Sequence, residues 1–104
     1  MNYNTILRMQ KEYGYSDLQK SINNGNCWHL EGSYGRAAMN ALEQGMCMLP
    51  KVVMYDAYGG KVPSRDMVAA GSKGSYKNCL NFWERVNDGN IFLEKECTDD
   101  VNDE

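Results

Sequence analysis

Apolar residues recur at spacings of three and four in the middle of the chain, where one stripe comprises Ala38, Met39, Leu42, Met46 and Leu49. This spacing predicts an α-helix with one face in the core. Ser33 is a suitable N-cap, because its hydroxyl can accept a hydrogen bond from a backbone N–H that the first turn leaves unpaired. Gly45 suits a left-handed C-terminal position, and Pro50 cannot continue the helix. We therefore expect a helix of about three turns across the centre of one small core.

Three further helices are expected. Residues 4–13 carry Ile6 and Leu7 as inward positions, and Ser16 begins an S-x-x-Q pattern that indicates a capping box and a helix to about Asn24, closed by Gly25. A last helix is expected from residue 76 to about residue 86 with Ser75 as its N-cap. Its apolar stripe comprises Tyr76, Cys79, Leu80, Trp83 and Val86.

The pattern changes after Pro50. Residues 51–63 contain β-favouring residues on both sides of Gly59-Gly60, which predicts a β-hairpin. Because an isolated hairpin is marginal in water, we expect it to lie on the helices or to pair with residues 27–30 or 90–93. The predicted fold class is α+β: about four short helices with a small antiparallel sheet built on the hairpin.

Length and charge complete this outline. The 104 residues predict a single globular domain over residues 1–93. Residues 94–104 carry six acidic residues and one basic residue, or −5, so we expect a disordered acidic tail; the rest, with ten basic and eight acidic residues, is about +2. With no secretory leader and no apolar run of ~20 residues, we expect a cytoplasmic protein without a membrane partner.

The four cysteines, Cys27, Cys47, Cys79 and Cys97, contain no C-x-x-C pair. Structural zinc sites usually have closely spaced ligand pairs, so the pattern argues against a metal site, and no cofactor is expected. Cys47 and Cys79 lie among apolar residues and read as buried thiols. His29 is the only histidine, and a lone histidine beside Trp28 is more often structural than catalytic.

The motif G-S-x-G occurs twice, at residues 32–35 and 71–74, each time at a predicted helix start. Helix N-termini present unpaired N–H groups and a partial positive charge, so they can hold a phosphate or carboxylate. The candidate anion-binding residues are Ser33, Gly35, Arg36, Ser72, Lys73, Gly74, Ser75 and Lys77. Neither copy is a P-loop or a dinucleotide-binding fingerprint, and ordinary capping turns are the simpler explanation of both.

Six fragments carry a resemblance that covers about residues 10–93: YGYSDLQ, WHLEGSYGRAAM, CMLP, YGGKVPSRD, GSKGSYKN and FWERVNDG. They resemble a group of small uncharacterised proteins of tailed phages of gut bacteria and related bacterial genomes. The resemblance brings no assigned activity and no binding residues. It implies an accessory phage protein made in the cytoplasm of a bacterial host cell.

Three hypotheses follow from these patterns. The first is a non-enzymatic binding or adaptor protein that acts on a host or phage protein, because no nucleophile, base and orienting group occur together and because Tyr55 and Tyr58 suit an interface. The second is a binder of a phosphorylated small molecule or nucleotide at the two G-S-x-G turns. The third is a nucleic-acid-binding protein that uses the mildly basic body. The acidic pI would argue against this hypothesis only if the acidic tail belonged to the binding surface, and nucleic acid is the least expected of the three partners.

Overall fold

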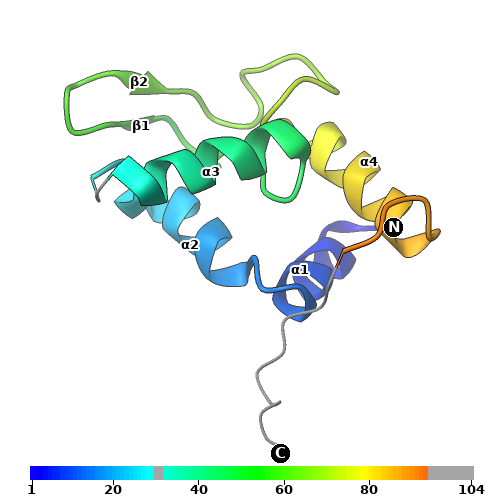
Figure 1. Ribbon diagram of the computed structural model, residues 1–104. Coiled ribbons are helices and arrows are strands. Elements are labelled where there is room, and N and C mark those ends of the chain that lie inside the picture. The colour runs from blue at the N-terminus through cyan, green and yellow to red at the C-terminus, as the bar shows by residue number, and fades with distance from the viewer. Residues whose placement is uncertain (30–31, 94–104) are drawn as a thin grey trace, which may run out of the picture.

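Helices supply most of the regular structure in the computed structural model, which describes residues 1–29 and 32–93 (Figure 1). Within these ranges the elements are α1 (Tyr3–Glu12), α2 (Ser16–Asn24), the short 3₁₀ helix η1 (Asn26–Trp28), α3 (Gly32–Gln44), β1 (Met54–Tyr55), β2 (Lys61–Val62) and α4 (Tyr76–Asn87). Four α-helices and one two-stranded antiparallel sheet confirm the predicted α+β class. The predicted acidic tail lies outside the described residues.

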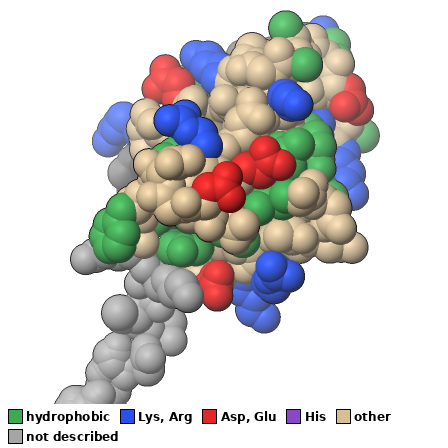
Figure 2. All heavy atoms as spheres, turned by 90° about the vertical axis from the view of Figure 1, so that its right-hand side faces the viewer, with side chains coloured by type: hydrophobic (Ala, Val, Ile, Leu, Met, Phe, Trp, Pro, Cys, Tyr) green, Lys and Arg blue, Asp and Glu red, His purple; other side chains and the backbone are tan. Residues whose placement is uncertain are grey.

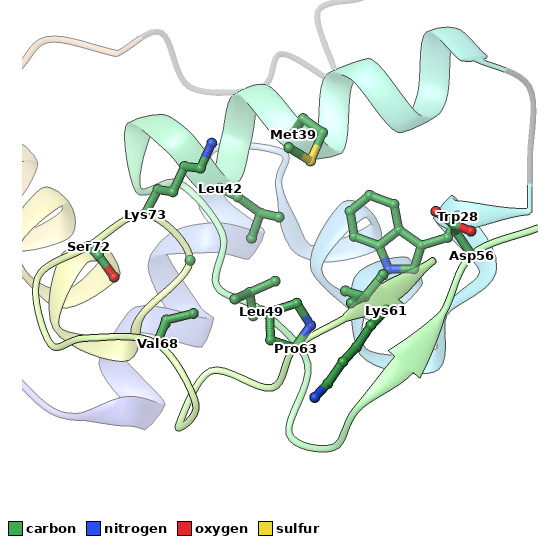
Figure 3. Close-up of a pocket in the computed structure, with 12 residues that line it drawn as sticks. Trp28, Met39, Leu42, Leu49, Asp56, Lys61, Pro63, Val68, Ser72 and Lys73 are labelled. Atoms are coloured by element: carbon green, nitrogen blue, oxygen red, sulfur yellow. The ribbon is translucent and has the colours of Figure 1, made fainter. Parts of the chain in front are cut away.

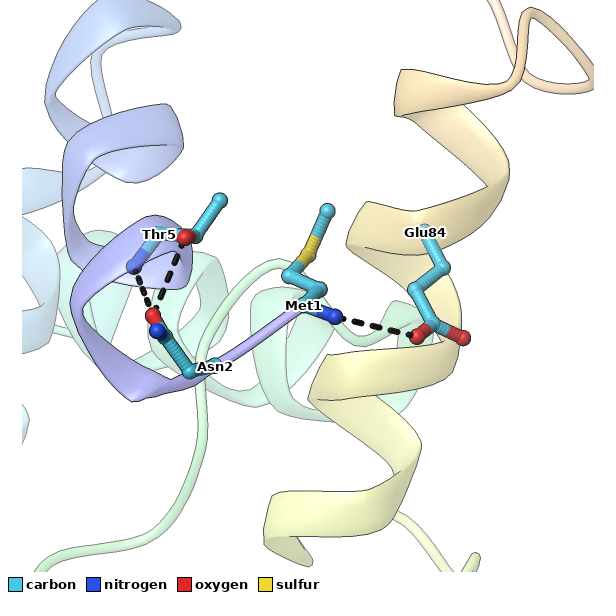
Figure 4. Close-up of polar contacts among 4 residues, drawn as sticks. All are labelled: Met1, Asn2, Thr5 and Glu84. Carbon is cyan, nitrogen blue, oxygen red and sulfur yellow. Dashed lines mark hydrogen bonds and ion pairs between the residues drawn. The ribbon is translucent and has the colours of Figure 1, made fainter.

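Side-chain caps fix the starts of α1 and α4. The Asn2 side chain accepts a hydrogen bond from Thr5 N at 2.9 Å, and Ser75 Oγ accepts one from Asn78 N at 3.0 Å, as predicted for Ser75. The amino group of Met1 lies 3.9 Å from the Glu84 carboxylate (Figure 4). The beginning of α1 is therefore held beside the middle of α4.

The predicted capping box at Ser16 is wrong. The N-cap of α2 is Tyr15 without a side-chain cap bond, and Gln19 does not turn back to the helix start. Gln19 is buried instead, and its amide bonds both the N–H and the carbonyl of Met48 at 2.9 Å. A tertiary partner has displaced the local one, because the buried Met48 backbone needs a donor and an acceptor.

Residues 46–50, which we call the central strap, run through the interior and lie in no helix or strand. Side chains from three helices and one loop bond the backbone of the strap. Met46 O accepts from Gln10 Nε2 at 2.9 Å and Trp83 Nε1 at 3.0 Å, and Leu49 O accepts from Arg65 Nε at 2.7 Å. Arg65 N also donates to Pro50 O at 2.9 Å. The strap thus has the bonding of a central strand without a neighbouring strand.

Two apolar clusters pack against the strap. Cys47 and Leu49 belong to the first, together with Ile22, Cys27, Ala38, Ala41, Leu42 and Val62. Met48 belongs to the second, together with Ile6, Met9, Cys79, Phe82, Trp83 and Val86. Successive side chains of an extended chain point to opposite sides. The strap therefore forms a wall between the two halves of the core.

The hairpin forms as predicted, with Met54 opposite Val62 and Tyr55 opposite Lys61. Asp56 closes its turn, since Oδ1 accepts from Tyr58 N at 2.9 Å and Gly60 N at 2.7 Å. The expected third strand is wrong at both candidate places. Residues 26–28 form η1 instead, and residues 90–93 are not a strand.

The hairpin is attached to η1 rather than to another strand. Ala57 N donates to Trp28 O at 3.3 Å, and His29 Nε2 donates to the Tyr55 carbonyl at 3.1 Å. These bonds cover the outer edge of β1. The single histidine therefore has a structural partner, as its position beside Trp28 suggested.

Helix α3 differs from its prediction at both its start and its stripe. It begins at Gly32, so Ser33 lies in the first turn and is not the residue before the helix. Ala38, Ala41 and Leu42 are buried, whereas Met39 is 47% exposed. Its end is as expected: Gly45 follows with φ +104°.

Replacing Gly45 with alanine should destabilise the protein by about 2–4 kcal/mol. A Cβ at this position would lie 2.7 Å from Phe82 Cβ in addition to the strain of the left-handed backbone. Gly89→Ala is the matched control, since Gly89 has φ +83° and no atom within 4 Å of the added Cβ. Urea unfolding should give a control loss of only about 1 kcal/mol, and equal losses would contradict the close contact.

Replacing Gln19 with methionine, which has a similar shape, should cost about 2–5 kcal/mol. The change leaves the Met48 N–H and carbonyl buried without partners. Gln44→Met, on the exposed end of α3, is the control and should change the free energy of unfolding by less than about 1 kcal/mol. A near-neutral Gln19→Met would mean that the strap does not depend on its side-chain partners.

Candidate functional site

A groove of about 510 Å³ opens between α3, the hairpin and the loop before α4 (Figure 3). Its lining is mainly apolar, with a few polar groups. The lining residues are Trp28, Met39, Leu42, Leu49, Asp56, Lys61, Val62, Pro63, Val68, Ser72, Lys73 and Gly74. Cavities of this size and character are typical of binding sites for small ligands or inserted side chains.

Glycine 74 brings the loop close to the strap. Gly74 N donates to Leu42 O at 3.2 Å, and Leu49 N donates to Gly74 O at 2.9 Å. A Cβ on Gly74 would lie 2.6 Å from Leu49 Cδ1, and the backbone has φ +85°, so only glycine fits here without rearrangement. One wall of the groove is thereby fixed to both α3 and the strap.

The charged groups of the groove lie at its borders. Lys73 lies near Met39 on the α3 side, while Lys61 lies beside Pro63 on the opposite border (Figure 3). Lys73 Nζ is 3.9 Å from the carboxylate of Glu43, an exposed pair that stabilises little. The Asp56 carboxylate already accepts two bonds from the hairpin turn. Lys73 and Glu43 balance each other, and Asp56 and Lys61 contribute one charge of each sign, so the border of the groove carries charges of both signs.

Trp28 forms one end wall. Its Nε1 is buried and has no hydrogen-bond partner among the described residues. An unpaired buried N–H costs about 1–3 kcal/mol. An acceptor that arrives with an occupant, after a small turn of the indole, would recover that cost.

The two G-S-x-G turns do not form one site. Lys73 of the second turn lies beside Glu43 near the end of α3, whereas Ser33, Gly35 and Arg36 lie in its first two turns. Ten residues of helix separate Ser33 from Glu43, or about 15 Å. The two turns therefore offer two separate places rather than one shared site, and an anion at either of them stays a prediction.

The N–H groups of the second turn also have partners within the protein. Gly71 N donates to Ser75 Oγ at 3.0 Å, Ser72 N to Ala69 O at 3.0 Å, and Ser75 N to Ser72 O at 3.1 Å. Ser75 Oγ also caps α4. An anion at this turn would have to replace Ser75 Oγ as the acceptor for Gly71 N. Arg36 and Lys77 are exposed on separate helices. The structure thus brings Ser72, Lys73 and Gly74 into the groove and leaves the other candidates outside it.

The predicted interface tyrosines lie on the hairpin that borders the groove. Tyr58, at the tip, is 98% exposed, and Tyr55 is 58% exposed. The bonds of Asp56 hold the tip, and the bonds from Trp28 O and His29 hold its base. Two large side chains are therefore presented on a positioned backbone.

The sequence did not reveal Trp28, Met39, Val62, Pro63 or Val68 as parts of a site. They come from four segments that share no local motif, and Met39 was expected in the core. The exposure of Met39 within an apolar stripe would have indicated a site, but a single sequence does not show which residues are exposed.

Three thiols are buried: those of Cys27, Cys47 and Cys79. Burial raises the pKa of Cys27 to about 11 and that of Cys79 to about 12, and it raises the pKa of Cys47 further. These thiols are protonated at neutral pH and therefore poor nucleophiles. No group of three or more potential metal ligands occurs within the ranges that the structure covers.

Charge on the face that carries α4 is mixed. Lys and Arg side chains alternate with Asp and Glu side chains there, without a continuous basic surface (Figure 2). None of the helices in the described part of the chain is long and apolar enough to cross a bilayer.

Comparison of the chain with protein-family models, with curated proteins and with solved structures gives no match in any of the three. The class of the site is therefore described from the fold and the groove alone. It is an apolar groove, with charges of both signs at its border, on a small α+β scaffold.

The buried thiols give a test of the core. In a Cys97→Ser variant, an aromatic disulfide reagent at about pH 8 should label no cysteine in the folded protein and all three in urea. Because the Cys27 pKa is raised on folding, its contribution to stability is complete below about pH 9 and decreases as the pH rises towards 11. Cys27→Ala should therefore reduce the loss of stability over this pH range. Labelling of the folded Cys97→Ser variant would contradict the burial of the three thiols.

Proposed function

We propose that this chain is a non-enzymatic binding protein that recognises another protein through the groove and the adjoining hairpin. The observation that carries the proposal is the position of an apolar groove beside two exposed tyrosines on an anchored hairpin. Tyrosine and tryptophan are enriched at the residues that dominate binding energy. Trp28 lines the groove, and Tyr58 extends from its border into solvent.

The packing around the groove supports binding without a large rearrangement. The hydrogen bonds of Gly74 to Leu42 and Leu49 hold one wall, and those of Trp28 and His29 hold the hairpin. A cavity that is already open avoids part of the entropic cost of ordering loops on binding. Its apolar lining suits one or two apolar side chains of a partner.

The partner in this proposal is a host or phage protein in a bacterial cytoplasm. This setting comes from the resemblance of residues 10–93 to small proteins of tailed phages. The phosphate-binding alternative has less support, because the first turn begins α3 whereas Lys73 of the second lies near the other end of that helix. The mixed charge in Figure 2 gives no particular support to nucleic-acid binding.

Photocrosslinking from defined positions tests the proposal. With p-benzoylphenylalanine at position 58 or 39, we expect one specific crosslinked protein from cells of the host, and Met39→Glu should abolish the crosslink from position 58. Position 92 is the matched control, because Phe92 is 87% exposed but does not line the groove. Equal crosslinking from position 92, or no specific product from 39 and 58, would contradict the proposed surface.

A further inference from the structure

The outer edge of β2 carries unpaired backbone groups. Bonded and non-bonded pairs alternate along an antiparallel ladder. Asp56 N donates to Gly60 O, which places residues 56 and 60 on the bonding side of the hairpin. The Tyr55 carbonyl points the other way and accepts from His29. Lys61, opposite Tyr55, therefore directs its N–H and carbonyl away from β1.

Lys61 is also one of the residues that line the groove. The sheet has only the order β1-β2, and within residues 1–29 and 32–93 no backbone or side-chain bond outside the hairpin reaches Lys61. The groove is lined by the successive residues Lys61, Val62 and Pro63, but not by Met54 or Tyr55. Lys61 and Val62 of β2 and the following Pro63 all line the groove, so β2 is the strand of the hairpin that borders it.

We infer that the groove receives an extended segment of a partner protein, which adds to the hairpin as a third strand beside β2. This inference rests on the function proposed above and specifies the partner. Pairing of an incoming strand with an open sheet edge is a common mode of peptide recognition. Pro63 has no N–H, so the edge offers one bonded residue pair, at Lys61, and apolar contacts supply most of the affinity.

Strand geometry gives the sequence pattern of this segment. The residue opposite Lys61 points to the same face as the Lys61 side chain, where an acidic side chain is favoured. Its two neighbours point to the other face, together with Val62, towards Leu42 and Leu49 at the base of the groove. The occupant is therefore an apolar–acidic–apolar segment in extended conformation.

The test uses three capped pentapeptides that differ only at the centre: Thr-Ile-Glu-Ile-Thr, the same peptide with lysine in place of glutamate, and the glutamate peptide N-methylated at the central residue. In amide NMR titrations, the glutamate peptide should shift residues 61–62 and slow the exchange of the Lys61 amide hydrogen. N-methylation removes the donor to Lys61 O and should weaken binding about tenfold. Lys61→Glu should reverse the preference between the glutamate and lysine peptides.

Lys20→Glu, an exposed change of equal charge on α2, is the control and should leave the preference unchanged. Equal affinity for the methylated and unmethylated peptides, shifts confined to residues away from β2, or no binding of any peptide would overturn the inference. So would binding of decanoate at Trp28 and Leu42 without peptide binding, or dimerisation through the groove. If the crosslink from position 58 forms while the peptides fail, the proposed function stands and only the strand pairing is wrong.

Discussion

The hydrogen bonding of the central strap is the constraint on which this structure depends. Residues 47–50 are buried and Met46 is half-buried, yet none of the described strands lies beside them to bond their N–H and carbonyl groups. Each such group left unpaired would cost about 1–3 kcal/mol, and a small domain has only about 5–15 kcal/mol in total. Gln10, Gln19, Arg65 and Trp83 provide the bonds. Because these side chains come from α1, α2, the loop after β2 and α4, the strap fixes the relative positions of all four.

The groove inherits its shape from the same interactions. Arg65 bonds Leu49 O and reaches Asn23 of α2, which holds the chain just after β2 and Pro63. Gly74 bonds Leu49 N and Leu42 O, which holds the opposite wall. The distance between the two walls is thus set through Leu49. An opening that is fixed in this way can select a partner by shape, because closing or widening it would break bonds in the core.

Local signals in the sequence were sufficient for most of the elements. Apolar spacing, the caps at Ser75 and Gly25, and the Gly59-Gly60 turn correctly predicted the helices and the hairpin. The arrangement could not be predicted, because it depends on polar residues that serve distant backbone groups. Gln19 fitted a local capping motif, and nothing near Gln10 in the sequence indicated that its amide is buried. The groove was missed for a related reason: its lining joins five segments, namely η1, α3, the strap, the hairpin and the loop before α4. In addition, Met39 lies at the edge of the stripe that suggested a core position.

The way in which the polar groups are used favours recognition over reaction. Within the described part of the chain, His29 bonds Tyr55, Asp56 closes the hairpin turn, and the three buried cysteines are held protonated by burial. Among the described residues near the groove, the polar groups without a partner are the backbone N–H and carbonyl of Lys61 and the buried indole N–H of Trp28, and two exposed tyrosines lie beside them. An N–H and a carbonyl on a strand edge are suited to another backbone, and aromatic rings are suited to apolar side chains. A partner that satisfies both requirements must present a short strand with alternating apolar side chains. The positive charge of Lys61 at the groove border adds an acidic residue to that pattern.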